Sequence, residues 1–391
     1  MKAIIIGAGR IGRGFVTELL SKNDVLLSFF DYNKDLVLQM NQNRKYTIHV
    51  LGNPSKNSEI SGYQAFSIDD EEALVKEWAS AEFIFTAVGG KNLRTVAALI
   101  AKAYSRVCDL NAIKKINIVT CENWIEPAKE LKETILSHLS SEKQRLFKSY
   151  VGVSESVIMA SGVSAPPNET VTNPADTWVQ DFWYLPIDKS QIIGEIPKWE
   201  YFSFIDGFGD LLQQKLYTNN TSVALIAYLG YLKGHMYVAD AANDSEIEPI
   251  LDLAYQEINQ ALIKGLNIDE TSQLTFSKRA KEKYQNRDII DVLVRIARDP
   301  IRKLSPADRL IGPAKLALHA GIKPYAISLA IAAALFFDYP EDKDAVQLKE
   351  IRTEKGIDTI LKDICGLKIE DELYTLIMES IEELKKKQWL K

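Results

Sequence analysis

The chain opens with a glycine-rich turn that strongly constrains its fold. Gly7-Ala8-Gly9-Arg10-Ile11-Gly12 follows the apolar run Ala3–Ile6, and a second apolar run, Val25–Phe30, ends at Asp31, 19 residues after Gly12. In a strand–turn–helix unit with this spacing, the first glycine permits a tight turn. The second lets a pyrophosphate approach the backbone, and the third lets the helix pack on the strand. The sequence therefore predicts a Rossmann-type domain that binds a dinucleotide.

The choice of dinucleotide depends on Asp31. Its carboxylate can accept hydrogen bonds from ribose hydroxyls and would repel a 2′-phosphate, so we predict NAD, although Lys34 weakens the preference over NADP. A tight turn and a surface aspartate without any cofactor is the alternative interpretation. We expect the pyrophosphate to lie against the turn, so the predicted cofactor-binding residues are Gly7, Gly9, Arg10, Ile11, Gly12 and Asp31.

Further apolar runs in the first half, Phe83–Val88 and Ile116–Thr120, alternate with helical patterns. This alternation predicts a doubly wound parallel sheet, in which ligands bind beyond the carboxyl ends of the strands. Gly89-Gly90, directly after the first of these runs, is compatible with a plain turn and equally with backbone close to the dinucleotide. We place the predicted Rossmann domain at residues 1–195.

The second half has a helical pattern, and we predict a mostly α-helical domain over residues 196–391. Apolar positions from Ile247 to Leu262 recur at helical spacing, with Ser245 and Glu248 as a predicted capping box and Gly265 as the predicted end. Further helices are predicted at Ile289–Ile296, Ala326–Phe337 and Leu373–Leu384.

Composition limits the function classes. The 391 residues contain 47 Lys and Arg against 53 Asp and Glu, a formal net charge of −6, which argues against a general binder of nucleic acid. No apolar stretch reaches the length of a membrane span, and the N-terminal apolar run is too short for a signal peptide. Three separated cysteines and four histidines form neither a CxxC pair nor an HExxH motif. We therefore expect a cytoplasmic protein without a metal, a membrane partner or a nucleic-acid partner.

The stretch Lys215-Leu-Tyr-Thr-Asn219-Asn220-Thr221-Ser222-Val223 suggests the chemistry. It resembles the K-x4-N-x2-H motif of the polyol-specific long-chain dehydrogenases, the mannitol dehydrogenase family. Cys121-Glu122-Asn123 is similar to that family's C-[DE]-N turn. The opening Gly7–Phe15 and the later blocks Tyr228–His235 and Asp299–Leu310 are similar as well, so the resemblance covers nearly the whole chain.

The resemblance implies an NAD-dependent oxidoreductase that interconverts a sugar alcohol and its ketose. A hexitol phosphate such as mannitol 1-phosphate, paired with fructose 6-phosphate, is the expected substrate. Alcohol oxidation requires a base for the hydroxyl proton while hydride moves to the nicotinamide, and donors for the developing alkoxide. Lys215 is the expected base, and Asn123 and Asn220 are the expected donors, in a cleft between the domains. A solvated lysine and a helix-capping asparagine are the alternative interpretations of Lys215 and Asn220.

Two departures from the family motif fall on the predicted substrate side. Val223 stands where the family has its histidine, and the stretch from Ser154 to Ala160 lacks the family's Asp-Arg. Valine can neither donate nor accept a hydrogen bond from its side chain. We therefore expect altered substrate preference or weak activity more than loss of NAD binding.

A basic cluster supplies the predicted substrate-binding residues Arg302, Lys303 and Arg309. Phosphate capture is one interpretation, and ion pairing with Asp299 and Asp308 is the other. Two alternative functions remain open: an NAD-dependent reductase of a uronate such as fructuronate or tagaturonate, and a redox-inactive NAD-binding paralogue. The expected partner is a small polyol or polyol phosphate, and the expected assembly is a monomer or small homo-oligomer.

Overall fold

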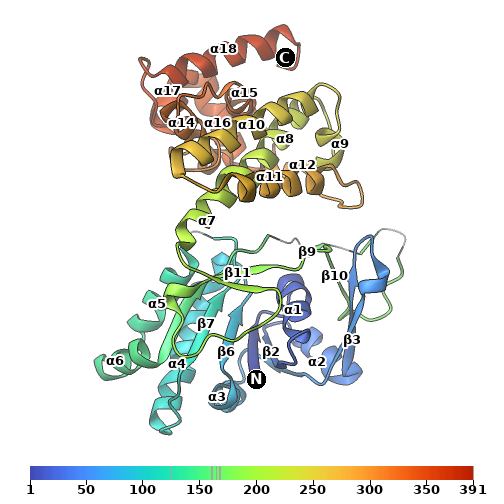
Figure 1. Ribbon diagram of the computed structural model, residues 1–391, viewed down its shortest axis with the longest axis vertical. Coiled ribbons are helices and arrows are strands. Elements are labelled where there is room, and N and C mark those ends of the chain that lie inside the picture. Colours follow the sequence, from blue (N-terminus) through green and yellow to red (C-terminus); the bar gives the residue numbers. More distant parts are fainter. Residues whose placement is uncertain (125, 160–161, 164, 167–168, 391) are drawn as a thin grey trace. The chain divides into compact units, whose positions relative to one another are not determined.

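The computed structural model describes residues 1–124, 126–159, 162–163, 165–166 and 169–390. It divides into two compact units, Met1–Phe208 and Gly209–Lys391, each with its own hydrophobic core (Figure 1). The first contains the parallel sheet and the second is helical, which confirms the fold class predicted from the sequence.

A six-stranded, all-parallel sheet forms the centre of the first unit. Its strands, in spatial order, are β5 (Gln64–Ser67), β2 (Leu26–Asp31), β1 (Lys2–Ile6), β6 (Phe83–Thr86), β7 (Ile116–Thr120) and β8 (Val151–Glu155). The chain runs outward from β1 in both directions, so the order reverses between β1 and β6. In open sheets of this kind, ligands bind outside the carboxyl ends of the strands at such a switch point.

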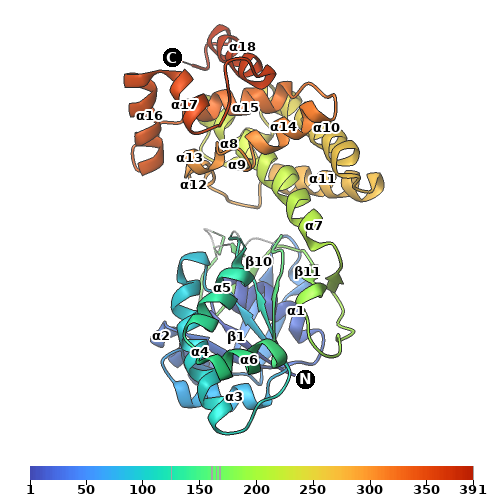
Figure 2. The same cartoon turned by 90° about the vertical axis from the view of Figure 1, so that its left-hand side faces the viewer.

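Helices cover one face of this sheet (Figure 2). Ile4, Ile84 and Ile118 point toward this face and pack with Trp78 and Tyr104 of the covering helices. Because a parallel sheet is buried on both faces, successive apolar residues of a strand pack alternately against one face and then the other. The covering helices are α3 (Glu71–Ser80), α4 (Leu93–Asp109), α5 (Pro127–Ser137) and α6 (Ser141–Tyr150).

The opposite face is covered differently. The alternate residues Ile5, Phe29 and Phe85 pack against the first helical turns after β1 and against aromatic side chains that include Trp199 and Phe202. The elements here are the π-helical turn η1 (Arg10–Val16), α1 (Thr17–Ser21), α2 (Lys34–Asn43), and the pair β11 (Leu185–Asp188) and β12 (Phe202–Ile205). A second sheet in this unit contains β4 (Ser58–Ser61), β3 (Lys45–Val50), β10 (Thr177–Val179) and β9 (Gly162–Val163). Short 3₁₀ turns are η2 (Pro54–Lys56), η3 (Gly90–Asn92) and η4 (Lys189–Gln191).

The second unit is built from helices around two nearly all-apolar ones. α8 (Thr221–Leu232) and α15 (Tyr325–Leu335) are buried along almost their whole length and form the centre of the core. Around them lie α7 (Phe208–Lys215), the π-helical turn η5 (Leu216–Asn220), α9 (Val238–Ala242), α10 (Ile247–Leu266), α11 (Glu270–Gln285), α12 (Leu293–Ala297), α13 (Pro300–Lys303), α14 (Ile311–His319), α16 (Lys343–Lys355), α17 (Ile357–Asp363) and α18 (Glu372–Lys386).

Three local predictions in this unit are wrong. The predicted helix Ile289–Ile296 begins only at Leu293, because Val292 pairs as an isolated β-bridge with Tyr237. The predicted capping box at the start of α10 is absent, and the Asp244 carboxylate instead accepts the N–H groups of Glu246 and Ile247. Gly265 does not end α10. The helix continues to Leu266 and closes on Asn267 in the left-handed conformation.

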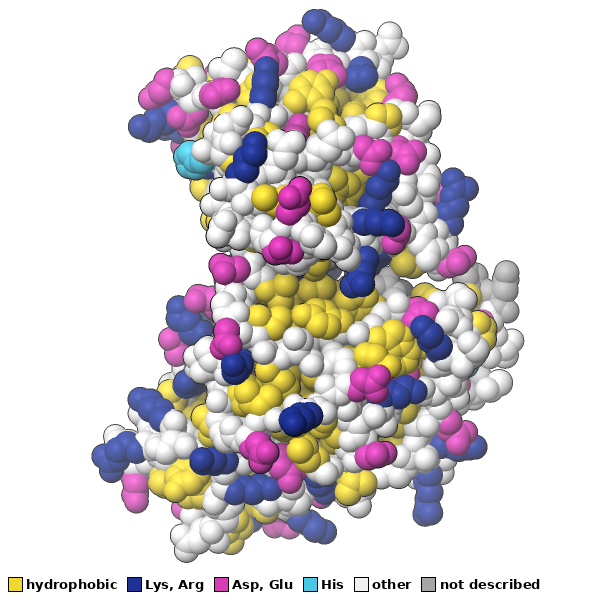
Figure 3. All heavy atoms as spheres, viewed as in Figure 1, with side chains coloured by type: hydrophobic (Ala, Val, Ile, Leu, Met, Phe, Trp, Pro, Cys, Tyr) yellow, Lys and Arg dark blue, Asp and Glu magenta, His cyan; other side chains and the backbone are white. Residues whose placement is uncertain are grey.

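Charged side chains of both signs are interspersed over the face shown in Figure 3, on each of the two units. This is the pattern expected for a chain with a small net negative charge. Among the described residues, no helix combines the length and apolar character needed to cross a membrane.

Candidate functional site

The glycine-rich turn lies at the switch point of the large sheet and has the geometry of a phosphate cradle. Gly7 has φ +97°, and its N–H donates to the carbonyl oxygen of Phe30 at 2.8 Å. A side chain on Gly12 would collide with the Gly7 carbonyl group, so helix and strand pack closely there. At Gly9 the backbone is extended and an added Cβ would meet no atom within 4 Å. The open space over Gly9 fits a pyrophosphate, which the turn can bind through backbone N–H groups.

Asp31 ends β2 and connects to the same turn. Asp31 is only 8% exposed, and its two carboxylate oxygens accept the N–H groups of Ala8 at 2.6 Å and Asn33 at 2.8 Å. A carboxylate has about four acceptor positions, so acceptor capacity remains for ribose hydroxyls. Arg10 is exposed and Ile11 is half-buried.

Arg13 locks the turn to the second sheet, a role that sequence reasoning missed. Its guanidinium donates to the carbonyl oxygens of Ala8 at 2.6 Å and Ala175 at 2.9 Å, and its own carbonyl accepts the Tyr46 hydroxyl at 2.7 Å. Arg13 directly follows Gly12 in the sequence. Burial lowers the pKa of Arg13.

Glu122 braces the neighbouring strand ends. This buried carboxylate lies beside β6, where it accepts hydrogen bonds from the Thr86 hydroxyl at 2.8 Å and the Val88 N–H at 3.0 Å. Burial raises its pKa. Gly89, with φ +79°, follows Val88 at the same sheet edge as the glycine-rich turn. Asn123 comes directly after Glu122 and is exposed. The hydrogen bonds of Glu122 therefore help to fix the backbone position of Asn123.

Lys215 and Asn220 lie on an irregular turn of the second unit. Lys215 ends α7, the π-helical turn η5 follows, and Asn220 ends η5 immediately before α8. In a π-helical turn, hydrogen bonds join residues five apart, so residues at this spacing return to the same side. The structure therefore brings these two predicted residues to one end of α8.

The electrostatic environment of Lys215 suits a base. Lys215 is half-buried, and burial together with the positive charges of Lys283 and Arg309 lowers its pKa to about 8. A lysine with an unshifted pKa carries almost no free amine at neutral pH, whereas this one carries an appreciable fraction. Lys283, on α11, has its own pKa lowered to about 8, chiefly by burial. Sequence reasoning missed Lys283 because it lies 68 residues from Lys215 and outside any motif.

Two asparagines follow Lys215 on the turn. Asn220 is half-buried, and no described residue is hydrogen-bonded to its carboxamide. The backbone carbonyl oxygen of Asn219 accepts the Tyr284 hydroxyl at 3.0 Å, whereas the buried side-chain Oδ1 of Asn219 has no hydrogen-bond partner among the described residues. Val223, at the family's histidine position, is buried in α8 and adds an apolar surface in its place.

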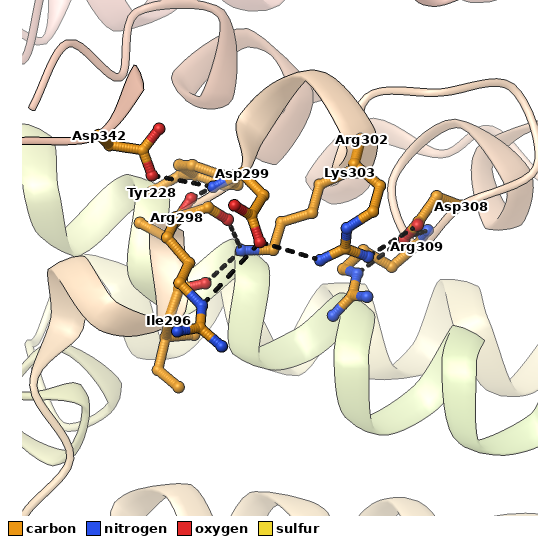
Figure 4. A network of polar contacts seen from close by, with 10 residues as sticks. Tyr228, Ile296, Arg298, Asp299, Arg302, Lys303, Asp308, Arg309 and Asp342 are labelled. Atoms are coloured by element: carbon orange, nitrogen blue, oxygen red, sulfur yellow. Dashed lines mark hydrogen bonds and ion pairs between the residues drawn. The ribbon is translucent and has the colours of Figure 1, made fainter. Parts of the chain in front are cut away.

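The predicted substrate-binding cluster is engaged in internal contacts (Figure 4). Arg309 Nε contacts Asp308 at 2.7 Å, and Arg302 contacts Asp308 at 3.2 Å and Asp299 at 3.7 Å. Lys303 is buried, and its Nζ donates to the carbonyl oxygens of Ile296 and Arg298. Burial and the neighbouring arginines lower the pKa of Lys303 to about 7. Of the three, Arg309 is the one whose charge acts on Lys215.

Among the residues that the structure describes, no group of three or more His, Cys, Asp or Glu side chains is arranged to bind a metal ion. All three cysteines are buried and free.

Two family models match the chain. The mannitol dehydrogenase Rossmann domain matches residues 1–201, and the mannitol dehydrogenase C-terminal domain matches residues 210–385. The chain is 35% identical over 381 residues to mannitol-1-phosphate 5-dehydrogenase of Bacillus pumilus, an alignment that covers 97% of this chain and 99% of that relative.

Two solved structures have a similar fold. D-Sorbitol dehydrogenase in substrate-free form gives a TM-score of 0.82 at 14% identity, covering 99% of this chain and 93% of that chain. Mannitol 2-dehydrogenase of Pseudomonas fluorescens, solved as a ternary complex with NAD and D-mannitol, gives a TM-score of 0.71 at 14% identity, covering 100% and 92%.

Proposed function

The protein belongs to the mannitol dehydrogenase family, and from this premise we propose that it oxidises mannitol 1-phosphate to fructose 6-phosphate with NAD and catalyses the reverse reduction. The two domain matches confirm the family resemblance that the sequence motifs suggested, and they make the protein an oxidoreductase of the polyol dehydrogenase class. The observation that carries the choice of substrate is the near full-length similarity to a mannitol-1-phosphate 5-dehydrogenase.

NAD is the cofactor that the first unit fits. The open space over Gly9 accommodates a pyrophosphate, and Asp31 keeps acceptor capacity for ribose hydroxyls. A carboxylate at this position disfavours the 2′-phosphate of NADP. The family's Rossmann domain and the solved NAD complex of a related fold support the same choice. When bound, NAD supplies the hydride acceptor for oxidation and the hydride donor for reduction.

Lys215 acts as the general base in polyol oxidation. Its free amine takes the proton of the reacting hydroxyl, the C–H hydride leaves carbon, and a ketone forms; one NADH and one proton are produced for each ketose. The pKa of about 8 gives Lys215 a mixed protonation state near neutral pH, so the protonated form can return the proton during ketone reduction. Asn220 and Asn123 donate hydrogen bonds to the oxygen as negative charge develops on it.

Val223 favours one second candidate, a redox-inactive NAD-binding paralogue. A buried valine removes one polar contact from the substrate side while leaving the glycine-rich turn, Asp31 and Lys215 in place. Such a protein would bind NAD and turn over no polyol.

A steady-state assay of NADH absorbance tests the proposal. The substrates are mannitol 1-phosphate, fructose 6-phosphate, mannitol and fructose, with wild type, Lys215→Met and Lys278→Met. Lys278 is an exposed lysine on α11 and serves as the matched control. We expect turnover of the phosphorylated pair, a loss of at least about a hundredfold in Lys215→Met, and wild-type rates in Lys278→Met. NAD binding without turnover of any of these substrates would support the inactive paralogue, and near-normal turnover in Lys215→Met would refute the assigned base.

A further inference from the structure

A buried amide network lies beside the turn that carries Lys215. Gln273, on α11, is fully buried. Its Oε1 accepts from the Gln214 amide at 2.9 Å, and its Nε2 donates to the Thr218 hydroxyl at 3.0 Å and to Asn259 Oδ1 at 2.8 Å. Both amide hydrogens are therefore used, which is the condition for burying such a group at little cost.

The two partners of Gln273 on the turn flank Lys215. Gln214 is the residue before Lys215, and Thr218 lies three residues after it, inside η5. One side chain from α11 thus connects both flanks of Lys215. The same helix makes a second contact with the turn. The Tyr284 hydroxyl donates to the backbone carbonyl oxygen of Asn219, near the end of η5, at 3.0 Å.

An irregular turn needs this kind of support. π-Helical turns are rare and occur mostly as single turns, often at functional sites, so their geometry depends on contacts made by neighbouring elements. The network is also anchored away from the turn, because Asn259 of α10 donates to the Ser277 hydroxyl at 3.1 Å. Every member is uncharged. A carboxylate in the place of Gln273 would favour protonated Lys215, whereas a neutral amide fixes the turn without adding charge.

We infer that Gln273 is a positioning residue, which holds Lys215 in its reactive place by connecting Gln214 to Thr218. This inference rests on the proposed role of Lys215 as the base. Gln273 itself contacts neither substrate nor cofactor in this scheme and acts only through the turn.

The test compares Gln273→Met with a matched control, Gln285→Met. Methionine is close to glutamine in size and removes all three hydrogen bonds. Gln285 is on the same helix and is also hydrogen-bonded, to Glu248 and the Ala242 carbonyl, but does not contact the Lys215 turn. We expect Gln273→Met to lower the kcat plateau at high pH by at least about tenfold, with KM changed less than about threefold, because small displacements of a reacting group are costly. Gln285→Met should keep the wild-type plateau.

A readout independent of turnover follows the same variants. The rate at which trinitrobenzenesulfonate modifies Lys215 is measured against pH by peptide mass spectrometry, which reports the titration of Lys215 directly. In Gln273→Met we expect this titration to move to higher pH, because a loosened turn exposes Lys215 to water. If Gln273→Met only lowers the melting temperature and leaves both plateau and Lys215 titration unchanged, the inference is wrong.

Two further outcomes keep the inference separate from the proposed function. If Gln273→Met does not fold, Thr218→Val removes a single hydrogen bond of the network and should move the plateau and the titration in the same directions; wild-type behaviour of that variant would overturn the inference. If the Lys215 titration moves in Gln273→Met while Lys215→Met retains turnover, Gln273 does position Lys215 and the proposed base is wrong.

Discussion

The charge of Lys283 should control the pH at which the enzyme works. Lys215 has a pKa of about 8, so about 9% of it is free amine at pH 7. At the ordinary value of 10.5 the free fraction would be about 0.03%, roughly 300-fold less. Burial is the largest cause of this shift, and the positive charge of Lys283 is the next. Lys283→Met removes that charge and keeps an apolar chain of similar length.

The sign of the effect follows from the charge removed. Without Lys283 the protonated form of Lys215 is repelled less, so its pKa rises toward the ordinary value. Like charges about 10 Å apart at an effective dielectric constant near 20 repel by about 1.7 kcal/mol, which corresponds to about one pKa unit. The free amine at pH 7 then falls about tenfold, and kcat for polyol oxidation falls with it. Because the pKa of Lys283 is itself about 8, the effect is largest below pH 8.

The assay measures kcat in both directions over pH 6–10, for wild type, Lys283→Met and the exposed-lysine control Lys278→Met. Oxidation needs unprotonated Lys215 and reduction needs the protonated form. Lys283→Met should therefore lose oxidation at pH 7 and gain reduction by up to about twofold near pH 8, where wild-type Lys283 is still partly charged, while Lys278→Met matches wild type. General damage to the site would lower both rates. Profiles of Lys283→Met that superimpose on wild type, or move to lower pH, would refute the electrostatic argument.

Three further predictions concern other parts of the chain. Gly12→Ala should lose both NAD binding and stability because its Cβ has no room, whereas Gly9→Ala should fold normally, by circular dichroism, and lose only NAD affinity, by fluorescence titration. Arg13→Met should unfold at least about 2 kcal/mol more easily in urea and bind NAD about tenfold more weakly, because two carbonyl groups lose their donor; exposed Arg94→Met should change neither. Burial raises the pKa of Glu257 to about 7 from 4.5, so its ionisation destabilises the folded state as pH rises through that window. Glu257→Gln should therefore gain up to about 3 kcal/mol of unfolding free energy relative to wild type between pH 4.5 and 8, and a constant difference would contradict this.

The sequence was sufficient where function depends on a local pattern. The strand–turn–helix spacing around Gly7 and Asp31 predicted the dinucleotide domain, because the backbone geometry that a pyrophosphate needs is encoded within a few residues. Local patterns predicted the helix ends of the second unit incorrectly. Ser245 and Glu248 have the spacing of a capping box, yet Asp244 satisfies the N–H groups there, because several side chains compete for the same donors. The basic cluster shows the same limit: spacing alone could not tell that Lys303 is buried on backbone carbonyls.

The glycine-rich turn and the Lys215 turn both contain π-helical segments. This explains why the side chains that stabilise them could not be predicted from sequence motifs. η1 contains much of the cofactor-binding turn, and η5 joins Lys215 to Asn220. A regular helix is held by its own backbone, whereas a π-helical turn needs partners from elsewhere. These partners are distant in the chain: Arg13 within η1 reaches Ala175, and Gln273 reaches η5 from α11. A substitution at such a partner leaves every motif residue intact and still displaces the reacting groups. Variants of this enzyme that lose activity without touching a motif should therefore concentrate at the side chains that hold η1 and η5.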